Sequence, residues 1–196
     1  MRKMQMNLDR TLLAIEELRT LLKEAKNTDM ELPVLFMVSN GLRTGEVIGL
    51  RWRNIDFENK VIHMKDGLSS MSESGKKILE EKDFNYIKIV RDEKLNPYMI
   101  PYLDKQKDAQ KVKRESGNYY ANDLVISKED GSPILYNQFA TKCRWLIQKT
   151  LVSKNKPLTI LDIRYSVLSH VRIMGSYEKY WDQVFVEALE EHTHEE

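Results

Sequence analysis

The sequence has 196 residues, enough for one domain of ordinary size or one domain with a short appendage. Hydrophobic residues make up 41% and charged residues 31% of the sequence, and no run of 18 apolar residues could cross a membrane, which indicates a soluble globular protein without a membrane partner. The basic N-terminus is not followed by the apolar stretch of a signal peptide, so a cytoplasmic location is expected. The single cysteine, Cys143, excludes an internal disulfide bond and a multi-cysteine zinc site, and neither a metal nor a cofactor is predicted.

The net charge of +1 conceals an uneven distribution along the chain. Residues 178–196 hold seven acidic residues and one basic residue, a net of −6, so residues 1–177 carry +7. Residues 141–156 contain five basic residues, no acidic residue and Trp145; the basic residues are Lys142, Arg144, Lys149, Lys154 and Lys156. Such a segment suits a polyanion, because each neutralised phosphate releases counterions, but a solvated helix face explains it equally well.

Apolar residues at helical spacing predict an amphipathic helix over residues 15–26. Asn40 and Gly41 predict a helix stop or a tight turn, and another helix is expected over residues 43–51. Three strands are predicted next, over residues 61–64, 84–90 and 97–102. A polar, Ser/Gly-rich loop separates the first two strands, and the charged turn RDEKLN separates the second from the third.

The second half of the chain is predicted to be mainly helical. Residues 123–134 resemble a short strand and a Gly-Ser-Pro turn, and helices are expected over residues 135–151, 163–175 and 178–191. Helices on either side of a small antiparallel sheet, without regular βαβ alternation, predict an α+β domain.

One stretch combines these patterns with a specific set of residues. The segment SNGLRTGEVIGLRWRNID resembles the first conserved box of the tyrosine recombinases, the phage integrase family; the matching residues are Gly41, Leu42, Arg43, Glu46, Leu50, Trp52, Ile55 and Asp56. The segment TILDIRYSVLSHVRIMG resembles the second box, and DLVISKEDGSP resembles a segment between the two. The resemblance covers about residues 15–175.

The resemblance implies a mostly helical tyrosine-recombinase catalytic-domain fold with a small antiparallel three-stranded sheet. We expect a linker or N-terminal extension over residues 1–14, the integrase-like fold over 15–177, and an acidic C-terminal helix and tail over 178–196. The separate N-terminal core-binding domain that is usual in this family has no counterpart in the sequence.

Family chemistry requires cations that are already in place around a DNA phosphodiester. In these enzymes a tyrosine attacks the phosphorus, two arginines and a histidine contact its oxygens, and a lysine protonates the leaving oxygen. The resemblance assigns the first arginine role to Arg43, with Glu46 one helical turn away as its structural partner. A purely structural ion pair between these two residues is the alternative reading. Arg164 falls at the position of the second arginine.

Several family positions carry residues that cannot perform these roles. Leu161 stands where the second box has histidine, and Glu187 lies near the position of the LGH histidine. No tyrosine follows Tyr180 in the sequence, although the nucleophile is expected near its end. Lys94 is the candidate hairpin lysine, with an exposed lysine of no special role as the alternative. The catalytic set is therefore expected not to be intact, and Arg43, Lys94 and Arg164 to be its vestiges.

Two functions follow from this pattern. The first is a DNA-binding protein with an inactive recombinase fold, such as a transcriptional repressor of a phage or mobile element, that contacts double-stranded DNA through six basic residues: Arg43, Arg164, Lys94, Lys142, Arg144 and Lys149. The second is a fragment of an active recombinase whose nucleophile and N-terminal domain lie outside this chain. A third reading, a homodimer or regulatory protein contact through the C-terminal helix, is compatible with either.

Overall fold

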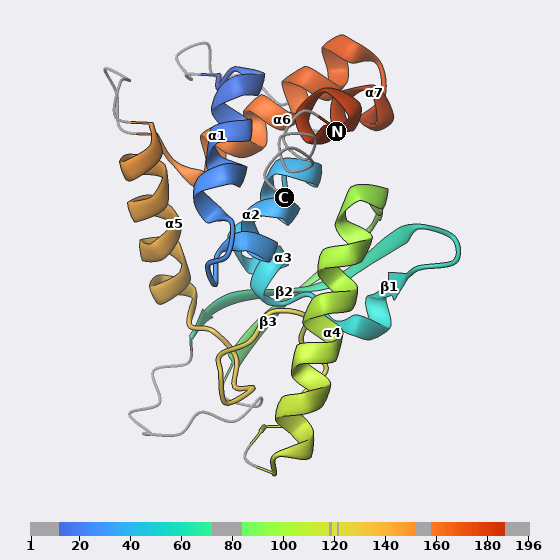
Figure 1. Ribbon diagram of the computed structural model, residues 1–196, viewed down its shortest axis with the longest axis vertical. Coiled ribbons are helices and arrows are strands. Elements are labelled where there is room, and N and C mark those ends of the chain that lie inside the picture. The colour runs from blue at the N-terminus through green and yellow to red at the C-terminus, as the bar shows by residue number, and fades with distance from the viewer. Residues whose placement is uncertain (1–11, 72–83, 118, 121, 152–157, 187–196) are drawn as a thin grey trace, which may run out of the picture.

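The computed structural model describes residues 12–71, 84–117, 119–120, 122–151 and 158–186 (Figure 1). The α-helices are α1 (Ile15–Ala25), α2 (Glu31–Asn40), α3 (Thr44–Ile48), α4 (Ile100–Glu115), α5 (Tyr136–Thr150), α6 (Ile160–Met174) and α7 (Tyr177–Trp181). The short turns η1 (Trp52–Asn54) and η3 (Pro97–Met99) are 3-10 helical, and η4 (Asp182–Val186) is π-helical. The strands are β1 (Ile55–Asp56), β2 (Val61–Met71) and β3 (Phe84–Lys94).

The strands form one antiparallel sheet in the order β1-β2-β3, which confirms the predicted α+β class and the small three-stranded sheet. Helices α3 and α5 pack against β2, while α1, α2, α6 and α7 gather into a helical group above the sheet in Figure 1. Helix α4 contacts η1 through Gln110, whose side chain accepts a hydrogen bond from Trp52 Nε1 at 2.9 Å.

Helix α2 lies at the centre of this helical group. Its residues from Leu32 to Asn40 are all buried, as expected for a helix that is apolar on every side. The C-terminal segment packs against it: the Tyr180 hydroxyl donates to Val38 O at 2.7 Å, and Trp181 Nε1 donates to Ser39 O at 2.9 Å. The last described helical turns are therefore part of the same hydrophobic core.

The predicted strand over residues 97–102 is wrong. Those residues form η3 and the first turn of α4, and β3 runs on through Arg91 to Lys94 where a turn was expected. The physical reason is the helix-start chemistry: Asn96 Oδ1 accepts from the Tyr98 backbone N–H at 3.0 Å, and proline is well suited to the first turn of a helix. The predicted hairpin loop is also shorter, because β2 extends to Met71.

Two glycines permit the turn and the close approach that precede the sheet. Gly41 ends α2 with φ 61°, the left-handed conformation predicted from the Asn-Gly pair. Helix α3 is shorter than the predicted 43–51 and lies so close to β2 that a Cβ on Gly45 would sit 2.0 Å from Leu68 O. The backbone of α3 can therefore reach β2 only with glycine at this position.

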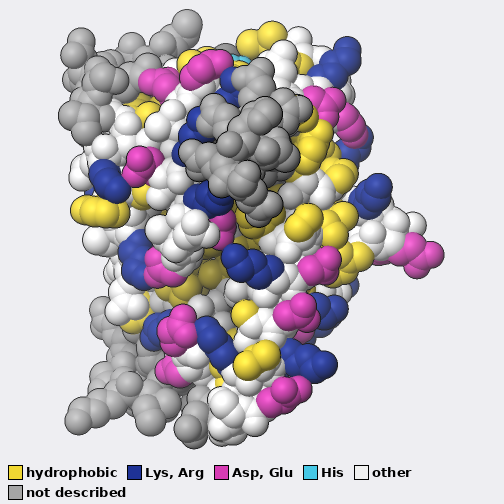
Figure 2. Space-filling model, in the orientation of Figure 1, with side chains coloured by type: hydrophobic (Ala, Val, Ile, Leu, Met, Phe, Trp, Pro, Cys, Tyr) yellow, Lys and Arg dark blue, Asp and Glu magenta, His cyan; other side chains and the backbone are white. Residues whose placement is uncertain are grey.

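On the face shown in Figure 2, basic and acidic side chains are interspersed, and neither sign gathers into a single patch. Lys113 of α4 pairs with Glu129 at 2.6 Å. Within the described part of the chain, every helix is too short or too polar to cross a membrane.

Candidate functional site

Arg43 is the N-cap residue of α3, and Glu46 is the third residue of that helix. The Arg43 backbone N–H donates to Glu46 Oε2 at 2.8 Å, and Arg43 Nη1 donates to Glu46 Oε1 at 2.9 Å. A carboxylate at this position satisfies the otherwise unpaired N–H at the start of the helix. The predicted pairing of the two residues is present, yet the Arg43 side chain is 58% exposed while that of Glu46 is 2% exposed.

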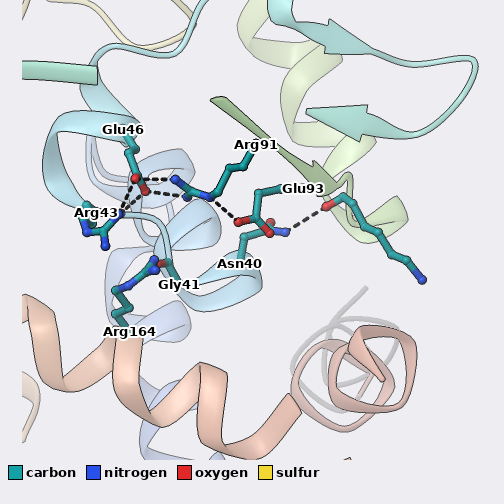
Figure 3. Close-up of polar contacts among 8 residues, drawn as sticks. Asn40, Gly41, Arg43, Glu46, Arg91, Glu93 and Arg164 are labelled. Carbon is teal, nitrogen blue, oxygen red and sulfur yellow. Dashed lines mark hydrogen bonds and ion pairs between the residues drawn. The ribbon is translucent and has the colours of Figure 1, made fainter. Parts of the chain in front are cut away.

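Arg91 on β3 is the second partner of Glu46 (Figure 3). Its Nη1 and Nη2 donate to Glu46 Oε1 and Oε2 at 2.7 and 2.8 Å, and its Nε donates to Glu93 Oε1 at 2.7 Å. Burial alone would raise the pKa of Glu46, but hydrogen bonds from Arg91 and from the Arg43 backbone lower it to about 2. The hydrogen bonds to Glu46 raise the pKa of Arg91 above its ordinary value. Both groups are therefore charged throughout the range in which the protein would operate.

Arg164 on α6 completes the cluster from the other side. Its Nη1 donates to Gly41 O, at the turn where α2 ends. Burial lowers the pKa of Arg164, and the nearby charge of Arg43 lowers it further. Three arginines and two glutamates thus carry a net charge of +1 within a small, partly buried region, an arrangement that favours an added anion.

The arginine groove is the depression beside this cluster, between the start of α3, one face of α5 and the start of α6. It is lined by Leu42, Arg43, Thr44, Tyr136, Asn137, Ala140, Arg144, Leu158, Thr159, Ile160, Leu161 and Arg164. Three arginines therefore line one groove: Arg43 at the start of α3, Arg144 on α5 and Arg164 on α6. The guanidinium fork matches the oxygens of a phosphate better than an ammonium does, which makes the groove a candidate phosphate-binding site.

The basic face predicted on α5 is divided in the structure. Arg144 lies on the groove side with Asn137 and Ala140, which are seven and four residues before it and so share one helix face. Lys142 and Lys149 lie on another face and pair with acids near the N-terminus: Lys142 with Asp29 in the turn between α1 and α2, and Lys149 with Glu24 on α1 at 2.9 Å. Trp145 is 63% exposed, and Lys149 Nζ lies 5.6 Å from the centre of its ring.

Lys94 is not placed on a hairpin turn. It ends β3 opposite Val61, at the far end of the β2-β3 pair from the connection between the two strands. Its Nζ lies 2.5 Å from Glu178 Oε1 on α7, and its backbone carbonyl accepts from Asn40 Nδ2 at 2.8 Å. The turn expected over residues 91–96 is replaced as far as Lys94 by the continuation of β3, and the strand expected after it is replaced by η3 and α4. The expected hairpin position of Lys94 is therefore wrong.

Leu161 occupies the position of the second-box histidine, and Tyr177 and Tyr180 are the last two tyrosines of the sequence. Leu161 is 46% exposed and lines the groove next to Arg164, one helical turn away. Burial and the charge of Glu93 raise the pKa of Tyr177 to about 12, and burial also raises the pKa of Tyr180. Tyr180 is therefore buried in the core, and Tyr177 is half-buried and packs against Trp181. Glu187 lies outside the described residues.

Arg91 and Glu93 were missed by reasoning from the sequence. Both lie in the segment RDEK that was assigned to a charged turn. The signal that could have revealed them is the alternation along β3, in which half-buried Ile89, Arg91 and Glu93 share one face and exposed Val90 and Lys94 take the other. Charged residues on the inner face of a strand require partners, and Glu46 is the partner of Arg91.

This fold and the paired boxes define a tyrosine-recombinase catalytic domain. Residues 11–196 match the phage integrase family, and the chain belongs to that family. A curated relative, the tyrosine recombinase XerC-like protein of Caldanaerobacter subterraneus subsp. tengcongensis, is 28% identical over 134 residues, which cover 61% of this chain and 33% of that protein.

Solved structures show the same fold. The Tn1549 transposon integrase in complex with transposon right end DNA has a TM-score of 0.64 and 16% identity, over 95% of this chain and 62% of that chain. The XerA recombinase has a TM-score of 0.59 and 17% identity, over 89% of this chain and 55% of that chain. The lambda integrase catalytic core has a TM-score of 0.54 and 14% identity, over 89% of this chain and 94% of that chain. This chain therefore spans about a third of its curated relative and matches the length of an isolated catalytic core.

Proposed function

We propose that this protein binds double-stranded DNA through the arginine groove without cutting it, and that it acts as a transcriptional regulator, such as a repressor, of a phage or mobile element. The observation that carries the proposal is the composition of the groove. Arg43 and Arg164 are held side by side, while Leu161 presents an apolar side chain where a hydrogen-bond donor would be needed for catalysis.

The two arginines can hold a phosphodiester by charge-assisted hydrogen bonds. Cleavage needs more: a nucleophile with access to phosphorus, a proton donor for the departing oxygen, and a further donor to the non-bridging oxygens. Leu161 cannot be that further donor, the buried Tyr180 hydroxyl donates to Val38 O, and Tyr177 is half-buried against Trp181. The DNA complexes of the Tn1549 transposon integrase support the choice of DNA as the ligand. DNA in a bacterial or phage-infected cell puts the site of action in the cytoplasm.

A second function, part of an active recombinase, is favoured by the span of the matches. The chain covers 33% of the XerC-like recombinase and 62% of the Tn1549 integrase chain, so a nucleophile and an N-terminal DNA-binding domain could come from elsewhere. The substitution at Leu161 opposes this function, because a missing segment does not account for a change inside the groove.

The C-terminal helix was also expected to contact a second copy or a regulatory protein. Its described part is occupied within this chain: Trp181, Val184 and Phe185 are each no more than 3% exposed. A contact in trans through these residues would require them to leave the core first. The remainder of that helix lies outside the described residues, and a dimer through it stays a proposal.

The proposal is tested by DNA binding and by a search for a covalent adduct. A duplex selected from a random library provides the probe, and its affinity is measured by fluorescence anisotropy over a range of salt concentrations. Each phosphate contact contributes about 0.9 to the slope of log K against log salt, so a slope well above 1 in magnitude is expected. The same duplex with a nick is then incubated with the protein and resolved under denaturing conditions.

We expect a salt-dependent complex and no covalent adduct. A phosphotyrosyl adduct would overturn the inactive reading and support the recombinase reading. Binding that does not weaken in Arg43→Met would show that the groove is not the DNA site. Lys113→Met serves as the matched control, since it removes one paired cation from α4 at a distance from the groove.

A further inference from the structure

The carboxylate of Glu46 lies between two arginines that hold it unequally. Arg91 donates two parallel hydrogen bonds, one to each oxygen, at 2.7 and 2.8 Å. The Arg43 guanidinium donates one, from Nη1 at 2.9 Å. Bidentate pairing of this kind is the stronger geometry. The charge of Glu46 is therefore taken up mainly by Arg91.

Burial reinforces the difference between the two arginines. The side chains of Arg91 and Glu46 are 26% and 2% exposed, whereas that of Arg43 is 58% exposed. Ion pairs away from water are screened less than pairs at the surface. The interior pair is thus Arg91 with Glu46, and Arg43 lies at its solvent edge, where it borders the arginine groove.

A second carboxylate fixes the orientation of Arg91. Its Nε donates to Glu93 Oε1 at 2.7 Å, and the Glu93 side chain is 14% exposed. Burial raises the pKa of Tyr177 at the start of α7, and the charge of nearby Glu93 raises it further. Three N–H groups of Arg91 are therefore committed to two carboxylates, and Figure 3 shows its guanidinium between them. Such a side chain is placed to support a neighbour and has few donors left for a ligand of its own.

We propose that Arg91 is a positioning residue for DNA binding: by neutralising Glu46 it leaves the charge and the outer donors of Arg43 available to a DNA phosphate. The inference rests on the proposed function of the groove. Without Arg91, Arg43 would be the one described ion-pair partner left to Glu46. The Arg43 guanidinium would then turn inward to form the fork that Arg91 now provides, and its charge would be cancelled.

The test is a rescue experiment on the selected duplex. Arg91→Met should weaken binding about tenfold, the size of a coupling between neighbouring charges, and should lower the salt slope by about 0.9 because one phosphate contact is lost. Adding Glu46→Gln to Arg91→Met should restore affinity to within about threefold of the wild type, since the carboxylate that captures Arg43 is then gone. Arg43→Met provides the reference for complete loss of that contact.

Two further variants separate charge from shape. Arg91→Lys keeps the positive charge but loses the fork, and it should retain most of the wild-type slope. Arg91→Gln is neutral but can still donate to Glu46, and it should behave like Arg91→Met; it replaces that variant if Arg91→Met does not fold. Circular dichroism and thermal melts establish the folded fraction of each protein, so that affinities refer to folded molecules.

The outcomes distinguish this inference from the proposed function. If Arg43→Met weakens binding and Arg91→Met does not, the groove binds DNA and the positioning role is wrong. The role is equally wrong if Glu46→Gln fails to rescue folded Arg91→Met, since a residue that acts only through stability predicts no recovery of the slope. If Arg43→Met itself binds as the wild type does, the proposed function fails first.

Discussion

Arg43 and Lys94 are two cations of almost equal exposure, at 58% and 61%, in opposite surroundings. Arg43 shares its carboxylate with Arg91 and lies near Arg164, so positive charge exceeds negative charge around it. Among the described residues, Lys94 is the one ion-pair partner of Glu178, so the two charges cancel. Exposure alone therefore does not identify a ligand-binding cation; the balance of neighbouring charges does.

The same comparison separates two parts of the molecule, the arginine groove and the end of β3. The groove side keeps three arginines from α3, α5 and α6 facing one depression. The end of β3, where Lys94 lies, contacts α7 through Glu178, and Tyr98 of the adjacent η3 donates from its hydroxyl to Asp182 of η4 at 3.1 Å. The arginine groove has excess positive charge for an anion, whereas the lysine at the end of β3 is already neutralised by Glu178.

The largest expected effect comes from disrupting the packing of α3, which begins next to Arg43, against β2. Gly45→Ala would place a methyl group 2.0 Å from Leu68 O, so α3 must move away from β2 and carry Glu46 away from Arg91. We expect a loss of more than about 3 kcal/mol in the free energy of unfolding, measured with urea.

Gly117→Ala is the matched control for this change. Gly117 has φ 82° and no atom within 4 Å of an added Cβ, so the same substitution costs only its backbone strain, about 1 kcal/mol. Equal losses in the two variants would show that the approach of α3 to β2 is not tight.

The next effect is on the free energy of unfolding at acidic pH. The pKa of Glu46 is lowered from 4.5 to about 2, so its contribution is fully present above pH 4.5 and is lost as the pH falls toward 2. Over that range the wild type should lose on the order of 3 kcal/mol more stability than Glu46→Gln. Urea titrations at pH 5.5 and at pH values near 2.5 measure the difference. Parallel curves for the two proteins would mean that Glu46 is not held as a carboxylate by its arginines.

DNA binding should separate Arg43 from Lys94 directly. Arg43→Met removes a charge-assisted contact worth about 1.5–3 kcal/mol, so affinity for the selected duplex should fall roughly 10- to 100-fold. Lys94→Met should change it less than about threefold, because Glu178 already pairs with that lysine. Anisotropy titrations at one salt concentration decide between them, and a larger effect at Lys94 would reverse the comparison.

The smallest effect sharpens the account of Lys94. Glu178→Gln releases the lysine from its partner, and we expect a slight strengthening of DNA binding, by less than about twofold. The variant Lys94→Met/Glu178→Gln should not show this gain. A strong increase with Glu178→Gln would indicate that α7 holds back a DNA-binding cation.

The amphipathic pattern of 15–26, the stop at Gly41 and the box around Arg43 were predictable because each depends on residues close in sequence. The sheet was predicted with three strands, but Pro97 and Pro101 were assigned to a strand although they begin a helix. The pairing of Glu46 with Arg91 could not be read in advance, because 45 positions separate the two residues. Which of them meet depends on the register of β3 against β2 and on the position of α3.

By itself the sequence determined the family, the α+β class and the apolar side chain at Leu161, since these depend on residue identity and local spacing. Only the tertiary structure decided which cations are available to a ligand. Arg43, Arg144 and Arg164 come from three helices and meet at one groove, whereas Lys142 and Lys94 meet acids instead. The physical reason is that the free charge of a side chain depends on its partners in space, which chain order does not specify.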